Sequence, residues 1–411
     1  MKKTSTFFLV TLLLIFFTFG AFFCLYGTLA SPMMEFFQVG TFEQGLITSL
    51  NCAGGAAIAV LIALLGDRFN KVYGVAAGIG LLVLGCGIVL AVPSFGWMLP
   101  IVFLCGVGTS LIDSMGNSLV IAYMPEKKNT FVPMLHSSHA IGTMVGPMLF
   151  PVLMDAAQPE TFKVDFLAVA IAGVAALVLF LLAARFFLKS QPLLPMEKQP
   201  KARERGGFGI VFRSKYAWIL VIVSICYFFF CWGKNSWLKY FFEREGGMSF
   251  AVSGIMLSAF FTGTLAVRLI GPFLLKFMRP SVMMGICMLA APLFLVLAVC
   301  IAPASPVLIG AICAVSGFFN GMGGVTPYLI AGEYFPKQLG SASAIPQFAN
   351  NAAGLLVPPL LGALAAWAGL RMPLLLAAGV GCLGAVIALV GFRKTPQEIE
   401  KREAAQDAVE I

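Results

Sequence analysis

One carboxylate stands well inside a long apolar run of the chain. Asp113 is followed four residues later by Asn117. Side chains four residues apart lie on the same face of a helix. An acid inside an apolar helix is energetically expensive, so by default it is functional or paired. Asp113 could therefore take up and release a proton or hold a solute hydroxyl group, and the alternative is a structural hydrogen bond between packed helices.

The only two histidines, His136 and His139, are three residues apart and share a face of the same predicted helix. Imidazole titrates near neutral pH, so either side chain could carry a proton. No acid or cysteine lies at ligand spacing, so a metal site is not indicated. We expect the deeper His139 to face a cavity. For His136, a cavity role and a capping or interface role are equally supported.

A lysine is embedded in an aromatic-rich run. Tyr227, Lys234 and Trp237 follow one helical stripe, with Gly233 and Asn235 beside the lysine. An embedded ammonium group could pair with an acid, or bind a carboxylate or phosphate of a solute. The aromatic rings could stack on the apolar face of a sugar. The alternative is that Lys234 snorkels to the membrane surface.

Five amide side chains also fall inside apolar runs. Amides in such helices more often bridge two helices than contact a ligand, so we expect one or two of them to reach the solute. They are Asn51, Asn320, Gln347, Asn350 and Asn351. Arg268 precedes Gly271 and Pro272, and we interpret it as an anchor at the cytoplasmic end of its helix.

The elements that position these groups follow from composition. Of the 411 residues, 60% are hydrophobic and 11% are charged, against about 45–50% and about 25% in soluble domains. A spanning helix needs about 20 apolar residues, and its backbone must satisfy its own hydrogen bonds. The runs are too long for a barrel. We therefore predict an all-α integral membrane protein with spans near residues 7–30, 44–65, 72–92, 97–121, 135–155, 164–188, 216–240, 250–275, 281–301, 305–330, 342–367 and 372–392.

The distribution of charge sets the orientation. With both termini in the cytoplasm, 21 of the 27 Lys and Arg residues lie on that side, four lie outside, and two lie within spans. This asymmetry favours a multi-pass protein of a cell membrane with both termini cytoplasmic. The ten cysteines all fall in apolar runs without CxxC spacing, which is typical of packing residues.

The two halves of the chain repeat. Glycines and a serine recur at an offset of 209, and two prolines at an offset of 211. The pairs are Gly45 and Gly254, Ser49 and Ser258, Gly54 and Gly263, Pro125 and Pro336, and Pro147 and Pro358. We therefore predict six-helix bundles at 1–188 and 216–392, a linker at 189–215 and a tail at 393–411. Such a repeat is typical of an alternating-access transporter with a site between its halves.

Residues 66–71 read Gly-Asp-Arg-Phe-Asn-Lys. This loop resembles the signature loop of the major facilitator superfamily, with Asp67, Arg68 and Lys71 matching. The resemblance implies twelve helices in two pseudo-symmetric bundles and a gating role for these three residues. Physically, an acid here can sit at a helix N-terminus and satisfy its dipole. Glu333 and Pro336 resemble the loop that follows the tenth span in many facilitators, and their counterpart in the first half is residues 125–128.

A narrower resemblance is to the fucose–proton symporter family. It is carried by Asp113 and Asn117 in the fourth span, and by Pro32, Gly45 and Ser49 in the first two spans. It implies that Asp113 takes part in substrate and proton binding, and that the histidines stand where polar side chains line the cavity. That family has a second acid four residues before the proline, where this chain has Thr28.

These features predict a secondary active transporter that moves a small polar solute, a sugar or related hydroxylated compound, across a lipid bilayer by alternating access. Proton coupling through Asp113 is a hypothesis. We expect a monomer without cofactor, metal or nucleic-acid partner. One rival is a drug or metabolite exporter, which 38 Phe and 19 Met residues would suit. A membrane enzyme is disfavoured, because no catalytic constellation is present.

Overall fold

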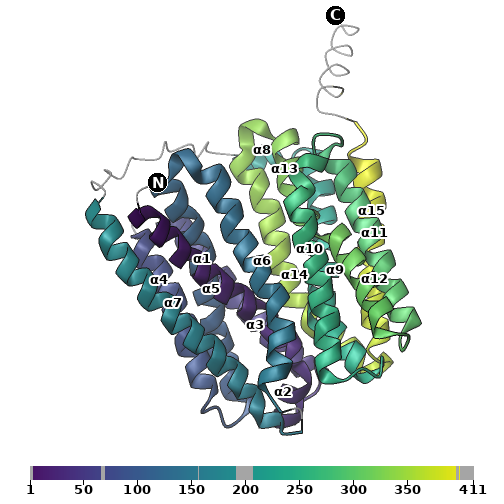
Figure 1. The fold of residues 1–411 in the computed structure, drawn as a ribbon. Coiled ribbons are helices and arrows are strands. Elements are labelled where there is room, and N and C mark those ends of the chain that lie inside the picture. The colour runs from purple at the N-terminus through teal and green to yellow at the C-terminus, as the bar shows by residue number, and fades with distance from the viewer. Residues whose placement is uncertain (1–2, 66–69, 156, 191–206, 395–397, 399–411) are drawn as a thin grey trace, which may run out of the picture.

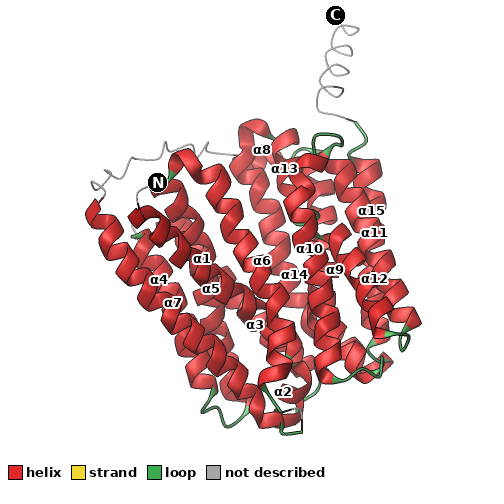
Figure 2. Ribbon diagram, viewed as in Figure 1, coloured by secondary structure: helices red, strands yellow, loops and turns green. Residues whose placement is uncertain are grey.

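Helices form all the regular secondary structure that the computed structural model describes, namely residues 3–65, 70–155, 157–190, 207–394 and 398 (Figure 2). Within these residues, 10 helices are long and apolar enough to cross a membrane. The prediction of an all-α membrane protein is therefore confirmed. The backbone hydrogen bonds of each span close within the span, which is what a hydrocarbon environment requires.

The first half of the chain forms one bundle. Helix α1 packs against α6 and α7, and α5 packs against α3 and α4. Each helix is predominantly apolar, since it faces either neighbouring helices or the region of lipid. The helices are α1 (Lys3–Thr28), α2 (Ala30–Phe37), α3 (Thr41–Leu65), α4 (Lys71–Val89), α5 (Phe95–Tyr123), α6 (Lys128–Leu153) and α7 (Phe162–Ser190).

The second half repeats this packing. Helix α15 packs against α9 and α11, and α12 packs against α10 and α11. The helices are α8 (Gly207–Val211), α9 (Lys215–Arg244), α10 (Phe250–Leu274), α11 (Pro280–Ile301), α12 (Pro306–Asn320), α13 (Thr326–Tyr334), α14 (Leu339–Ala368) and α15 (Arg371–Gly391). Short 3-10 turns at Pro125–Lys127, Pro159–Thr161 and Pro336–Gln338 precede α6, α7 and α14.

Two of the predicted spans differ from the ten apolar ones. Helix α6 is 26 residues long, but three internal prolines and both histidines make it less apolar. The run predicted at 305–330 is not one helix, because it breaks between α12 and α13. The break falls on Gly323 and Gly324, which pack against the ring of Tyr227 so closely that a Cβ on Gly323 would overlap it. The absence of a side chain on Gly323 therefore leaves the space that the Tyr227 ring occupies.

Both ends of the described chain lie at the same end of the bundle, where α1 begins and α15 finishes (Figure 1). We call this the terminal end, and the opposite end, where α1 finishes and α3 begins, the far end. This placement follows from an even number of crossings. It leaves the α2 segment and the starts of α3 and α10 at the far end (Figure 1).

Symmetry-related glycines let two helices cross closely within each bundle. A Cβ on Gly54 of α3 would overlap the backbone of α5, and one on Gly106 of α5 would overlap the backbone of α3. In the second bundle, a Cβ on Gly263 of α10 would overlap the backbone of α12, and one on Gly317 of α12 would overlap the backbone of α10. Gly263 follows Gly54 by 209 residues, and Gly317 follows Gly106 by 211. Small residues at such crossings let backbones approach, as is common in membrane bundles.

We expect Gly106→Val to lower the thermal stability of the purified protein sharply. The added side chain must displace the α3 backbone at Asn51, and such overpacking costs typically about 1–3 kcal/mol or more. The measurement is the melting temperature in detergent, with Gly80→Val as the control, since a Cβ on Gly80 meets no atom within 4 Å. Equal melting temperatures for the two variants would contradict this packing.

The two bundles touch each other through α3 with α14 and through α6 with α10. At the far end, Gly45 lies against Pro358 and its neighbour, and Gly254 lies against Pro147. These are the glycines and prolines that recur in the sequence repeat. The hydroxyl group of Thr41 also donates a hydrogen bond to the carbonyl of Gly362, at 2.6 Å. The halves are thus closed together at the far end by two symmetry-related contacts.

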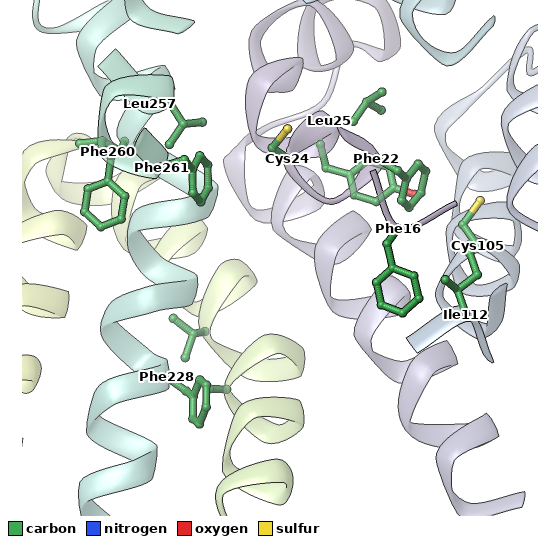
Figure 3. Close-up of a cluster of buried hydrophobic side chains, with 14 of the residues drawn as sticks. Phe16, Phe22, Cys24, Leu25, Cys105, Ile112, Phe228, Leu257, Phe260 and Phe261 are labelled. Atoms are coloured by element: carbon green, nitrogen blue, oxygen red, sulfur yellow. The ribbon is translucent and has the colours of Figure 1, made fainter. Parts of the chain in front are cut away.

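The buried apolar residues form a large cluster that extends through both bundles. Figure 3 shows part of it: Phe16, Phe22 and Ile112 lie among the helices of the first half, and Phe260 and Phe261 lie on α10 of the second. The close packing on each side fixes the helices as rigid bundles. It also determines which side chains remain free to face the region between them.

Candidate functional site

Aromatic rings and amides meet between the halves, toward the far end. The rings of Phe23 on α1 and Trp232 on α9 are 5.6 Å apart between centroids. A small cavity of about 20 Å³ lies beside them and is also lined by Asn51 and Asn235. Gly27 of α1 packs directly on the backbone of Asn235. This layer closes the region between the bundles on its far side.

Asp113 lies on α5 between the halves. Its Oδ1 accepts a hydrogen bond from Asn117 Nδ2 at 3.2 Å, so the two side chains share one face. The carboxylate lies close enough to His136 of α6 and to Tyr328 of α13 for electrostatic interaction. Tyr328 belongs to the other half. Asp113 is thus partly exposed within reach of groups from both bundles.

The sequence reasoning missed Tyr328. Its hydroxyl group donates a hydrogen bond to Gln347 Oε1 at 3.1 Å, and Gln347 in turn donates to Asn351 Oδ1 at 3.4 Å. The repeat could have identified it, because Tyr328 follows Asn117 by 211 residues. The tyrosine therefore extends the polar wall formed by two of the predicted amides.

The two histidines have different surroundings. His139 is partly buried, and its ring packs edge-on against Phe19 and Phe23 of α1, with centroid distances of 4.4 and 5.6 Å. The backbone of His139 also packs on Gly20. His136 is exposed and lies nearer the start of α6, at the terminal end. The deeper imidazole is therefore held between two rings of α1, while the shallower one meets a single α1 ring, that of Phe16 at 6.0 Å between centroids, and lies near Asp113.

We expected Arg268 to anchor the cytoplasmic end of its helix, and it lies in the last two turns of α10, which ends at Leu274 as the span predicted at 250–275 requires. Arg268 interacts electrostatically with Tyr227 and Cys231 of α9 and with His139 of the opposite half. Its side chain is exposed although Val267 beside it is buried. Arg268 therefore belongs to the polar surface between the halves. The sequence analysis did not predict that this side chain faces the opposite half.

Lys234 does not reach the membrane surface. Only 1% of the residue is exposed, and its Nζ lies 3.6 Å from the centroid of the Phe260 ring. The ammonium group donates a hydrogen bond to Asn235 Oδ1. Neither ion pair found among the described residues involves Lys234. The lysine is therefore a buried cation, stabilised by an aromatic face and an amide rather than by an acid.

The other two members of the predicted stripe on α9 make structural contacts. Tyr227 is buried, and its hydroxyl group donates a hydrogen bond to the carbonyl of Asn320 at 3.0 Å. Trp237 is 1% exposed, and its indole N–H donates to the carbonyl of Pro358 at 3.2 Å. The tryptophan thus holds α9 against α14, next to the closed contact at the far end.

Three of the five amides bridge helices. Asn51 donates to the carbonyl of Val102 on α5 at 3.1 Å, and Asn320 Oδ1 accepts from the Cys231 thiol. Asn350 accepts the indole N–H of Trp232 at 3.1 Å. Gln347 is exposed and Asn351 is partly exposed. These last two therefore have the most freedom to contact a solute.

A second acid inside a helix also escaped notice in the sequence. Asp165 lies in the first turn of α7, is fully buried, and has no hydrogen-bond partner at either carboxylate oxygen. Acids are common in first turns, where the helix dipole stabilises them, so the sequence position alone does not single it out. Helix α7 packs on α1 and α4, so Asp165 lies in the first bundle rather than between the two.

The predicted gating loop falls partly outside the described residues, which omit Asp67 and Arg68. Lys71 is the first residue of α4, and Asn70 caps this helix by accepting hydrogen bonds from two backbone N–H groups. At the corresponding place in the second half, Arg279 directly precedes α11 and forms an ion pair with Glu333, which lies near the end of α13, at 3.5 Å. Among the described residues, no group of three or more His, Cys, Asp and Glu side chains could hold a metal ion.

Comparison with known proteins agrees with this geometry. The family model for the Major Facilitator Superfamily matches residues 11–276 and 235–410. A cis,cis-muconate transport protein of Acinetobacter baylyi is 24% identical over 252 residues, which is 59% of this chain and 58% of the relative. The chain thus matches less than two thirds of the length of that curated relative.

Solved structures share the fold at low identity. A bacterial homologue of the human lysosomal transporter Spinster, inward-facing and unoccupied, has a TM-score of 0.79 at 16% identity, with 97% of this chain and 99% of that chain covered. The nucleoside transporter NupG has 0.75 at 15% identity, with 96% and 100% covered. FucP, in an outward conformation, has 0.62 at 17% identity, with 94% and 98% covered.

FucP is thus one of several transporters that share the fold, and other members fit at least as well. The comparisons therefore do not favour the fucose symporters over other members of the same fold. The broader one is shown by the family match across nearly the whole chain, together with the two-bundle architecture. This chain belongs to the Major Facilitator Superfamily.

Proposed function

We propose that the chain is a proton-coupled secondary transporter that moves a small polar solute, a sugar or a related hydroxylated compound, by alternating access. The observation that carries the proposal is the position of Asp113. It stands between the bundles, partly exposed, with His136 on its own side and Tyr328 across from it. A carboxylate inside a membrane bundle is costly unless it serves transport or is paired.

The terminal end faces the cytoplasm in this proposal. The excess of Lys and Arg on that side supports the orientation. The far end is packed shut by the contacts of Gly45 and Gly254, whereas His136, Arg268 and Gln347 are exposed. The state is therefore an inward-facing one.

Substrate exchange then follows from the packing. Rocking of residues 1–188 against 216–392 would separate the two glycine–proline contacts at the far end and close the terminal end. The polar groups between the halves would face each compartment in turn. Relatives named as transporters of nucleosides and of cis,cis-muconate support a small polar solute.

Proton coupling is assigned to Asp113, the acid that the described residues place within reach of both halves. Thr28, where the fucose symporters have a second acid, is buried, and its hydroxyl group donates to the carbonyl of Cys24 at 2.8 Å. The solute and proton therefore meet at one carboxylate. His139, held by Phe19 and Phe23, is the deeper of the two imidazoles that could assist the transfer.

Uptake by purified protein in liposomes tests this function. With an inward proton gradient, we expect accumulation of at least one compound from a panel of sugars, polyols and sugar acids, and loss of accumulation when an ionophore collapses the gradient. Transport that proceeds equally without the gradient would contradict proton coupling. Absence of any transport across the panel would contradict the substrate class.

A further inference from the structure

Arg268 is a cation without an acidic partner inside the described part of the chain. The ion pairs found there join Lys239 with Glu243 and Arg279 with Glu333, and neither includes Arg268. A charge on a spanning helix is rare and is normally paired or exposed to a water-filled cavity. Because no carboxylate of the described residues forms an ion pair with Arg268, the guanidinium group is available to an anion from solution.

The location of Arg268 makes it accessible. It lies six residues before the end of α10, which is about 9 Å along the helix axis. Helix α10 packs against α6 of the other half, and Arg268 interacts with His139 on that helix. The exposed side chain therefore stands between the bundles, on the terminal side of the layer formed by Phe23 and Trp232.

Polar and aromatic side chains elsewhere between the halves suit a polar organic molecule. Tyr328, Gln347 and Asn351 form a hydrogen-bonded wall on the same half as Arg268. Phe23 and Trp232 close the far side with aromatic rings. The amides and the phenol can bind hydroxyl groups, and the rings can contact carbon skeleton. Neither set of groups neutralises the guanidinium charge.

Resting on the transport function proposed above, we propose that the transported solute carries a carboxylate group, which Arg268 binds. The planar guanidinium fork matches a carboxylate in two parallel hydrogen bonds, and it stays charged at all physiological pH values. The solute is therefore a small organic acid, with its hydroxyl groups or carbon skeleton on the amide and aromatic walls. A neutral sugar would leave the arginine without a counter-ion.

A carboxylate fits better than a phosphate group. The second cation near the site, Lys234, is 1% exposed and its ammonium group is directed at Asn235 and the Phe260 ring. One accessible guanidinium group matches one negative charge. A phosphate dianion would lack a second accessible cation, apart from an imidazole that must first be protonated.

The test uses matched pairs of probes that differ only in the acid group. Purified protein is titrated with D-gluconate and sorbitol, lactate and propane-1,2-diol, and benzoate and benzyl alcohol, with glucose 6-phosphate as the phosphate probe. Binding is followed by thermal shift and by calorimetry. We expect at least one carboxylate to bind while its neutral partner does not, and the phosphate probe to bind more weakly than that carboxylate.

Variants of Arg268 test whether its guanidinium group binds the carboxylate. Arg268→Ala should weaken the carboxylate at least about tenfold, since hydrogen bonds to charged groups are worth about 1.5–3 kcal/mol. Arg268→Lys keeps the charge without the fork and should fall in between. Lys276→Ala, which removes a charge near the same end, is the control. Arg268→Gln serves if the alanine variant does not fold.

The proposal is overturned if no carboxylate probe binds, if neutral partners bind equally well, if glucose 6-phosphate binds best, or if Arg268→Ala binds unchanged. Its failure is separable from failure of the transport function. Proton-driven uptake of a polyol by a protein that binds no carboxylate would contradict the anion site but not the transport function. Arg268-dependent carboxylate binding without any transport would contradict the transport function but not the anion site.

Discussion

Asp113→Asn abolishes proton-driven accumulation but leaves solute exchange intact. The amide is nearly isosteric, so the hydrogen-bonding contact with Asn117 can persist, but it cannot take up or release a proton at neutral pH. Without a titrating group, the solute can still cross in either direction down its own gradient. Uptake against a gradient should fall to the level of empty liposomes, while counterflow of labelled against unlabelled solute should remain near the wild-type rate.

The matched control is Asp155→Asn, which removes an acid from the exposed loop after α6. This variant should accumulate solute as the native protein does. Accumulation by Asp113→Asn at the wild-type level would refute the coupling role of Asp113. Loss of both accumulation and counterflow, with binding abolished, would make Asp113 a solute ligand rather than a proton site.

Trp substitution of Gly45 or Gly254 should hold the far end open. Each glycine lies against the backbone at a proline of the opposite bundle, Pro358 or Pro147, so a large side chain cannot fit in the closed contact. Overpacking costs about 1–3 kcal/mol, which shifts a two-state equilibrium by roughly 5–150-fold. Counterflow should be nearly lost, because the inward-facing state is rarely reached.

The shift is measured by labelling a cysteine introduced at Gln347, which is exposed on the terminal side of the site. A water-soluble thiol reagent applied from that side should react at least about fivefold more slowly in Gly45→Trp or Gly254→Trp than in the parent. Gly80→Trp is the control, since its Cβ would meet no atom within 4 Å. Unchanged labelling with normal counterflow would show that these contacts do not form the gate.

The fold was largely predictable because hydrocarbon permits few structures. Long apolar runs must be helices, and the spacing of Gly45 and Gly254 already indicated a duplicated bundle. The repeat did not reveal that these residues form contacts between the two bundles. Gly45 contacts Pro358 and Gly254 contacts Pro147 across the halves, so the recurring residues pair with each other. That pairing depends on how two rigid bundles dock, which no single run encodes.

The site was predictable only in part. Asp113 stood out because an acid is conspicuous in an apolar run, and the hydrogen-bonded pair with Asn117 followed from helical spacing. For Arg268, the position near the end of its helix was predicted, but its interaction with His139 of the opposite half was not. Tyr328 went unnoticed, since it lies beyond a helix break that only the packing of Tyr227 on Gly323 explains. Which side chains face a cavity depends on helix rotation, and apolar composition fixes rotation poorly.

Two distances measured on one protein test the rocking motion most directly. Spin labels at Trp97 and Val307 report on the far end, and labels at Tyr73 and Phe277 report on the terminal end; all four positions are exposed. Pulsed electron resonance is recorded for each pair in a cysteine-free background with retained transport, alone and combined with Gly254→Trp. With this substitution, alternating access predicts a longer far-end distance and a shorter terminal-end distance. Distances that move in the same direction, or a far end that opens while the terminal end stays unchanged, would contradict it.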